Sequence, residues 1–170
     1  MQEKSQKGQS SVGGKQEYAM DKTDCYSYFG ICSNGIIKNG VGFIANSKSD
    51  FDPDYITDKL HIEPFDSNRM GTPRKNGHGS YPFSDWGACM QTEPAIDAEE
   101  QCVRIVRALK DKIPALLDIK KKFDVAFSLI IVPRIYNEET PVLCFNKEII
   151  EFCYRTGTEI GIDLYVYDKD

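Results

Sequence analysis

The segment 123–131 carries an apolar side chain at every second position, and no other feature of the chain limits the possible folds as strongly. The apolar residues at this spacing are Phe123, Val125, Phe127, Leu129 and Ile131. Successive side chains of a β-strand point to opposite faces, so the spacing predicts a strand with one buried face. The segment 160–167 repeats the pattern, with Asp163, Tyr165 and Tyr167 on its polar side. One-sided alternation favours a mainly antiparallel sheet that helices cover on one face.

Capping residues and apolar spacing predict three helices. The expected helices span 53–60, 97–121, with a break or restart at Pro114, and 147–156. Asp52, Asp97 and Asn146 stand at their starts, where each side chain can accept the free amide protons of a first helical turn. Pro53 suits the first position of a helix, because its missing N–H would be unpaired there in any case, and Gly157 suits the position that ends one.

Further strands are expected at 25–32, 41–45, 83–91 and 142–145. The dipeptides Asn34-Gly35 and Asn39-Gly40 are strong turn signals, so the segment 41–45 is predicted to be the return strand of a hairpin.

The strand predicted at 83–91 is expected to place Trp86, Ala88 and Met90 on one face. Residues 65–82 are rich in glycine, proline and asparagine and predict a long loop. The order of the elements predicts an α+β fold, in which about three helices pack on one face of a mainly antiparallel sheet. This order also allows ferredoxin-like split β-α-β units.

The first 22 residues are rich in Gln, Lys, Ser and Gly. Such a segment cannot bury enough apolar surface to offset the entropy that ordering costs, so residues 1–22 are predicted to be a disordered tail. Residues 23–170 are then expected to form a single α+β domain. No apolar run reaches the roughly 18 residues that a membrane helix needs. The N-terminus also lacks the apolar stretch of a secretion signal, so we expect a cytoplasmic protein.

The formal net charge of −5 argues against a nucleic-acid binder, because phosphate backbones select clustered positive charge. The same charge fits a basic protein partner, although it also serves solubility alone. The six cysteines form no C-x-x-C pair and lack metal-ligand spacing, so we expect free thiols, no metal and no cofactor. We expect Cys102 and Cys153 on buried helix faces and Cys144 in the strand 142–145.

A longer pattern runs from residue 50 to the end of the chain. It begins with Asp50-Phe51-Asp52-Pro53-Asp54-Tyr55-Ile56-Thr57, continues with Leu60, Pro64, Gly71 and Trp86, and ends with Ile162-Asp163-Leu164-Tyr165-Val166. With the helices and strands between these residues, the pattern resembles the domain-of-unknown-function 4279 family of bacterial proteins. The resemblance covers most of 25–168, apart from the hairpin at 33–49 and from Phe65, where the family would have threonine. It implies the fold, and the name of the family gives no activity to carry over.

Asp50, Asp52 and Asp54 have the D-x-D-x-D spacing that opens a calcium-binding loop. Tyr55 stands where that loop needs glycine and His61 where it needs a closing glutamate, so helix capping is the favoured role of Asp52. The two histidines of the chain have no orienting acid beside them in the sequence. We therefore assign no catalytic residue and no metal ligand.

The segment 71–80 is glycine-rich and basic, which makes it the candidate ligand site. The residues predicted to bind a ligand are Arg69, Arg74, Lys75, His78 and Trp86. Glycine amides and arginine forks bind phosphates, but the residue order of a nucleotide-binding P-loop is missing, and a solvated loop is the alternative interpretation. Trp86, the single tryptophan, is either a core residue or a ring that stacks on a ligand beside this loop.

Asp163, Tyr165 and Tyr167 are the candidate partner-binding residues, because tyrosines are enriched in protein interfaces. Two functions stay open. In the first, the chain is a non-enzymatic cytosolic binding protein, such as an immunity or inhibitor protein, that docks a basic protein partner through an acidic, tyrosine-bearing surface. This function predicts an exposed acidic patch and no deep pocket. In the alternative, it is a small-ligand or phosphate-binding domain in which Arg74 and Trp86 converge on a concave site. The sequence indicates no oligomeric state.

Overall fold

The computed structural model describes residues 22–37, 43–45, 48–95, 97–136 and 140–167. The strands of the main sheet are β1 (Asp24–Ser33), β4 (Pro64–Asn68), β5 (Asp85–Ala95), β6 (Val125–Tyr136), β7 (Thr158–Ile162) and β8 (Tyr165–Tyr167). Their order in the sheet is β4-β5-β1-β6-β7, and β8 pairs with the C-terminal end of β6. A separate hairpin consists of β2 (Gly35–Ile37) and β3 (Phe43–Ala45).

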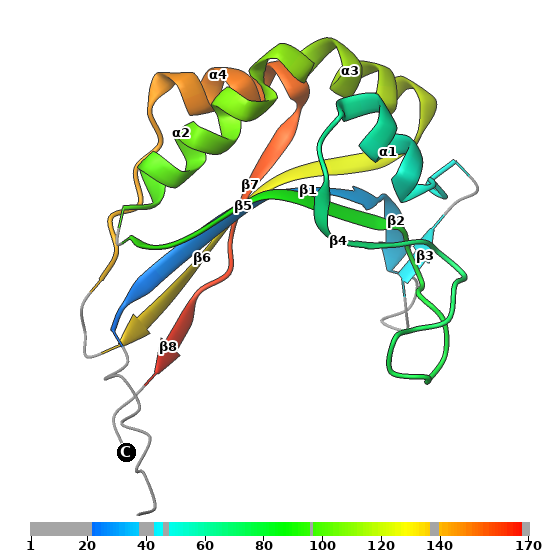
Figure 1. Ribbon diagram of the computed structural model, residues 1–170, viewed down its shortest axis with the longest axis horizontal. Coiled ribbons are helices and arrows are strands. Elements are labelled where there is room, and N and C mark those ends of the chain that lie inside the picture. Colours follow the sequence, from blue (N-terminus) through cyan, green and yellow to red (C-terminus); the bar gives the residue numbers. More distant parts are fainter. Residues whose placement is uncertain (1–21, 38–42, 46–47, 96, 137–139, 168–170) are drawn as a thin grey trace, which may run out of the picture.

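The helices lie together on one face of the sheet (Figure 1). They are α1 (Pro53–Leu60), α2 (Ala98–Leu109), α3 (Ile113–Lys122) and α4 (Lys147–Thr156). A 3-10 turn (Lys110–Lys112) joins α2 to α3, so these two form one helical run that restarts at Pro114. None of the helices in the described part of the chain has the length and apolar character needed to span a bilayer.

The strand pairings give the topology of the sheet. β1 pairs with β5 on one side and with β6 on the other, and both pairings are antiparallel. β5 and β6 therefore run parallel to each other with β1 between them, and the α2–α3 run connects them as a split β-α-β unit. β7 and β8 follow α4 and run parallel to β6. The predicted α+β fold, a mainly antiparallel sheet covered on one face, is confirmed.

Local hydrogen bonds explain where the helices begin and end. The side chains of Asp52, Asp97 and Asn146 each accept a hydrogen bond from a first-turn amide, at distances of 2.9 to 3.1 Å. These bonds satisfy donors that have no partner inside a helix. Gly157 ends α4 with a φ of 62°, in the left-handed region that only glycine adopts without strain. All four predicted helix signals are thus confirmed.

The core lies between the helices and the covered face of the sheet. The largest side chains that the sheet contributes are Phe29, Ile31, Trp86, Phe127 and Leu129. The helices contribute Ile56, Leu60, Ile105, Leu109, Leu116 and Ile119. Burial alternates along β1 and along most of β6, as the spacing of their apolar residues predicts. The alternation matters for function because it turns the remaining residues of both strands to the opposite face.

One strand prediction and one loop prediction are wrong. The segment 142–145 is not a strand, because Val142 forms only an isolated bridge with Asp97, and Cys144 is exposed. The segment predicted as a loop at 65–82 contains most of β4, which pairs with β5. The strand predicted at 160–167 is present as two short strands, β7 and β8, rather than one. Its apolar side is exposed and not buried, as the exposed fractions of Ile160, Ile162, Leu164 and Val166 show.

A bulge in β5 also changes the predicted position of Met90. The β1–β5 register shifts between the pairs Phe29–Ala88 and Ser27–Gln91, and Cys89 has a φ of 58° within this shift. Met90 therefore faces away from the helices, whereas Ala88 stays in the core.

Some predictions fall on residues that the structure does not describe. The turn at Asn39-Gly40 and the predicted tail, except Lys22, lie outside the described residues.

Candidate functional site

The face of the sheet opposite the helices, here called the open face, carries aromatic and acidic side chains. Its residues are Asp24, Tyr26, Tyr28 and Gly30 of β1, Asp85 and Gly87 of β5, and Ser128, Ile130 and Arg134 of β6. Their neighbours in β1, among them Cys25, Phe29 and Ile31, are buried beneath the helices. None of the described helices lies over the open face (Figure 1).

A hollow of about 380 Å³ lies in the open face where β1, β4 and β5 meet. Gly30 and Gly87 are paired across β1 and β5 and line it together. The larger side chains around them are Tyr26, Tyr28, Phe65 and Met90. A Cβ atom on Gly87 would lie 2.8 Å from the Phe65 ring, and one on Gly30 would lie 3.0 Å from Ser128 Oγ. The hollow therefore depends on the absence of a side chain at both glycines.

Aromatic rings form one side of the hollow. Phe65 of β4 leans over Gly87 and meets Tyr28 edge-on, with ring centroids 5.4 Å apart and ring planes at 81°. Tyr26 lies beside Tyr28 at 6.5 Å, with the two rings nearly parallel. Phe65 is 47% exposed, so its ring is accessible from solvent. These contacts hold the rings in place without covering them.

Carboxylates form the other side of the hollow. Asn68 Nδ2 donates to both carboxylate oxygens of Asp85, at 3.1 and 3.3 Å, which fixes the orientation of that group. Burial raises the pKa of Asp85, although the hydrogen bond from Asn68 opposes the rise. Asp66 accepts a hydrogen bond from Lys75 Nζ at 2.7 Å, and this bond lowers the pKa of Asp66. Among the described residues, no cation forms an ion pair with Asp85.

A second carboxylate on the open face already holds a cation. Arg134 donates to both carboxylate oxygens of Asp24, through Nε at 2.7 Å and through NH2. Its guanidinium carbon lies 5.7 Å from the centroid of the Tyr26 ring. An aspartate and a tyrosine of one strand thus bind a single arginine side chain between them.

The residues predicted to bind a partner extend the open face toward the C-terminus. Tyr165 donates its hydroxyl to Asp163 at 3.1 Å, and Tyr167 stacks on Tyr136 with centroids 4.5 Å apart. Burial raises the pKa of Tyr28, and the charges of Tyr26, Asp163 and Tyr165 add to the rise. Tyr165 pairs with Arg134 of β6, so it lies on the open face beside that arginine.

The basic residues predicted to bind a ligand are not brought together. Arg69 pairs with Asp52 at 2.8 Å and Lys75 pairs with Asp66. Arg74 Nε donates to the carbonyl oxygen of Ser80, which closes the loop on itself. His78 is exposed in the same loop.

Trp86 lies on the other side of the sheet from this loop. The residue is 1% exposed, and its indole Nε1 donates to Thr57 Oγ1 of α1 at 3.0 Å. Lys75 reaches the open face, whereas the indole points into the helical layer. The convergence of Arg74 and Trp86 that a phosphate site requires is not observed.

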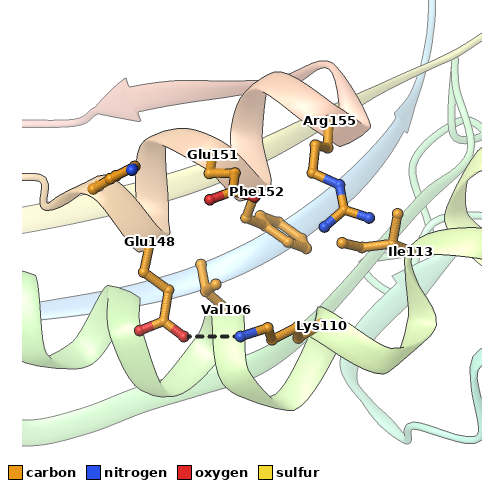
Figure 2. A pocket seen from close by; sticks show the side chains of 8 residues that line it. Val106, Lys110, Ile113, Glu148, Glu151, Phe152 and Arg155 are labelled. Atoms are coloured by element: carbon orange, nitrogen blue, oxygen red, sulfur yellow. Dashed lines mark ion pairs between the residues drawn. The ribbon is translucent and has the colours of Figure 1, made fainter.

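A second hollow, of about 500 Å³, lies between α2 and α4 (Figure 2). Its apolar lining consists of Val106, Ile113 and Phe152. Glu148 on its rim pairs with Arg107 at 3.3 Å and with Lys110 at 3.7 Å, so acid and base compensate each other across the two helices. We interpret this groove as a packing feature of the helical layer.

The thiols and acids of the described chain offer little to a catalytic or metal site. Burial raises the pKa of Cys25 to about 11 and that of Cys102 to about 12, so both stay protonated near neutral pH. The described residues contain no group of three or more His, Cys, Asp or Glu side chains that could hold a metal ion. What the open face can do chemically is bind a positively charged group through Asp85 and the rings beside it.

The sequence interpretation missed Tyr26, Tyr28, Phe65, Asn68 and Asp85 as site residues. The alternation in β1 places Tyr26 and Tyr28 on one face, which was a usable signal. Phe65 and Asp85 gave none, because only the pairing of β4 with β5 and of β5 with β1 brings them beside the tyrosines.

Comparison with known proteins identifies the family. The family model described as "Domain of unknown function (DUF4279)" matches residues 23–167, nearly the whole chain. The chain belongs to the DUF4279 family. The resemblance drawn from the segment 50–57 and the terminal strand is thereby confirmed. No curated protein and no solved structure matches the chain. The function of this DUF4279 member is therefore argued from the open face.

Proposed function

We propose that this DUF4279 protein is a non-enzymatic binding protein that docks a basic segment of a protein partner on its open face. The observation that carries the proposal is the joint presence of exposed rings and unneutralised carboxylates on a sheet face that none of the described helices covers. In a sheet with one helical layer, the other face usually carries solvated polar side chains. This face differs because it also carries exposed aromatic rings.

The aromatic residues support a protein interface. Tyrosine and phenylalanine supply a large contact area with few rotatable bonds, and they are enriched in interfaces. Tyr165 and Tyr167 are 45% and 43% exposed, close to the value for Phe65, so the rings are accessible without rearrangement.

The charges support a basic partner. Asp85 and Asp163 have no ion pair among the described residues, and the whole chain carries a formal net charge of −5. A negative surface attracts basic partners over distances of about a Debye length and orients them before contact. An immunity or inhibitor protein that neutralises a basic toxin in the cytoplasm is one specific form of this proposal.

The experiment maps where a basic polypeptide binds. A 12-residue peptide with four arginines and four lysines is titrated into isotopically labelled protein, and amide shifts are followed by NMR. We expect the largest shifts in β1, β5, β6 and β8, since these strands carry the open face.

Matched variants then test the face by affinity. Asp163→Asn combined with Tyr165→Ala removes one acid and one ring from the open face, and we expect about tenfold weaker binding, equivalent to about 1.4 kcal/mol. Glu151→Gln combined with Tyr154→Ala removes the same two groups from α4 and should change the affinity less than twofold. Shifts confined to the helices, or equal losses in both variants, would contradict the proposal.

A further inference from the structure

The open face holds one tyrosine and one aspartate that bind an arginine of the chain, and the hollow in it is lined by a second tyrosine and a second aspartate that pair with no described cation. In the first pair, Arg134 donates to both oxygens of Asp24 and lies over the ring of Tyr26. The second tyrosine and aspartate are Tyr28 of β1 and Asp85 of β5, which both line the hollow. Asp85 lies opposite Cys32, so the paired glycines Gly30 and Gly87 lie between the two residues. No described cation pairs with Asp85.

The side chains of Tyr28 and Asp85 are already fixed in position by neighbouring residues. Asn68 fixes the carboxylate of Asp85 through both of its oxygens, and the edge-on contact with Phe65 fixes Tyr28. The neighbouring acid, Asp66, is already neutralised by Lys75. The hollow therefore presents one free carboxylate beside two rings, which is a site for one cation and not for several.

We propose that the hollow is a recognition site for a single arginine side chain of the partner, whose guanidinium packs against Tyr28 and Phe65 and donates to Asp85. This proposal rests on the proposed function and names the side chain that the partner inserts. Gly30 and Gly87 form the floor of the hollow and leave room for the partner's arginine side chain. A Cβ atom at Gly87 would meet Phe65, and one at Gly30 would meet Ser128.

The chemistry favours arginine over lysine. A guanidinium is planar and weakly hydrated, so it loses little hydration when it stacks on a ring, whereas an ammonium group is compact and strongly hydrated. A guanidinium also presents parallel N–H groups, which match a carboxylate in a two-point contact. Arg134 makes such a two-point contact with Asp24 on the same face of the sheet.

The test compares two peptides that differ only in the basic side chain. One 12-residue peptide carries four arginines, and its twin carries four lysines at the same positions. Calorimetry measures both affinities, and NMR follows the amides of Gly30 and Gly87. We expect the arginine peptide to bind about tenfold more tightly and to shift both glycine amides more strongly.

Variants assign the preference to the hollow. Asp85→Asn should lower the affinity for the arginine peptide to that of the lysine peptide, whereas Asp163→Asn should weaken both peptides by the same factor. Gly87→Ala places a methyl group 2.8 Å from the Phe65 ring, so the ring must move and the floor of the hollow is filled, which should abolish the preference independently of Asp85. The fluorescence of Trp86, buried under α1, verifies that each variant is folded.

The outcomes separate the two proposals. Equal binding of both peptides on the open face, or an equal loss of both in Asp85→Asn, would overturn the arginine site and leave the proposed function intact. If neither peptide binds the open face, the proposed function itself fails. If free arginine amide at the same concentration gives the full effect, the site recognises the guanidinium group alone and needs no peptide around it, which supports the arginine site and contradicts the docking of a protein segment.

Discussion

Trp86 and Thr57 are joined by a hydrogen bond in which the indole Nε1 donates to the threonine Oγ1 at 3.0 Å. The bond ties β5 to α1 and turns the indole into the helical layer. Because neighbouring strand residues face opposite ways, Asp85 and Gly87 must then point to the open face, where both line the hollow. The buried tryptophan thus fixes the position of the site although it contributes no ring to it.

The first prediction concerns the bond between Trp86 and Thr57. Thr57→Val keeps the shape of the side chain but leaves a buried N–H without its partner, which costs about 1–3 kcal/mol in free energy of unfolding. Urea unfolding followed by tryptophan fluorescence measures the change. Thr57→Ser retains the hydroxyl and should be clearly more stable than the valine variant. Equal stability of the two variants would show that the bond is unimportant.

A second prediction concerns Phe65, which we expect to matter for binding and not for folding. Because the side chain is 47% exposed, Phe65→Ala should lower the free energy of unfolding by about 1 kcal/mol or less. The arginine peptide should nevertheless bind several-fold more weakly, since one of the two rings is lost. Tyr154→Ala, at an 86% exposed tyrosine on α4, is the control and should affect neither quantity. If Phe65→Ala strongly lowered the free energy of unfolding and left the affinity unchanged, Phe65 would be a folding residue and not a binding residue.

The third prediction concerns pH. Burial raises the pKa of Asp85 above its ordinary value of 3.8, the hydrogen bond from Asn68 opposes this, and the charge of Asp66 adds to the rise. Cation binding needs the charged carboxylate, and protonation on acidification removes that charge. The affinity for the arginine peptide should therefore fall as the pH is lowered from 7, with its midpoint above 3.8.

Calorimetry across this pH range measures the midpoint, and Asp85→Asn is the reference. The other titratable groups near Asp85 are Asp66 and Lys75, which pair with each other, Cys32 of β1, and Tyr28, whose pKa is raised above its ordinary value of 10.0. The pKa of Asp66 is lowered and those of Lys75 and Cys32 are raised, so none of them titrates between pH 4 and 7. A midpoint at or below 3.8 would contradict the role of Asp85.

The fourth prediction concerns the thiols. With a pKa of about 12, roughly one Cys102 side chain in 10,000 is a thiolate at pH 8, and burial blocks reagents as well. Iodoacetamide at pH 8 should therefore label the exposed Cys144 while Cys25 and Cys102 stay unmodified in the native protein. Peptide mass spectrometry over time measures the rates, and labelling in 6–8 M urea should make all sites react. Native labelling of Cys102 at the rate of Cys144 would contradict this prediction.

Local interactions explain why much of the fold was predictable. Asp52, Asp97 and Asn146 accept hydrogen bonds from amides only two or three residues away, so their capping role can be predicted from the adjacent sequence. The predictions failed where residues far away in the sequence determine the local structure. The segment 142–145 has the composition of a strand but finds only one bridging partner, and Met90 changes face because of a bulge that the sequence does not mark.

The candidate site was predictable only at its edge. Asp163, Tyr165 and Tyr167 were selected because alternation placed them on one side of a strand, and β8 does place Tyr165 and Tyr167 beside Arg134 and Tyr136 of β6. Trp86 was selected for its chemistry, and its burial under α1 removes it from any surface role.

What the sequence by itself determined is the set of capped helices and the two faces of β1 and of most of β6, because both follow from patterns within a few residues. What only the tertiary structure decided is the hollow. Gly30, Phe65 and Asp85 lie on three strands, and their meeting depends on the register between those strands. Register is selected by burial of the opposite face as a whole, so no local pattern encodes it.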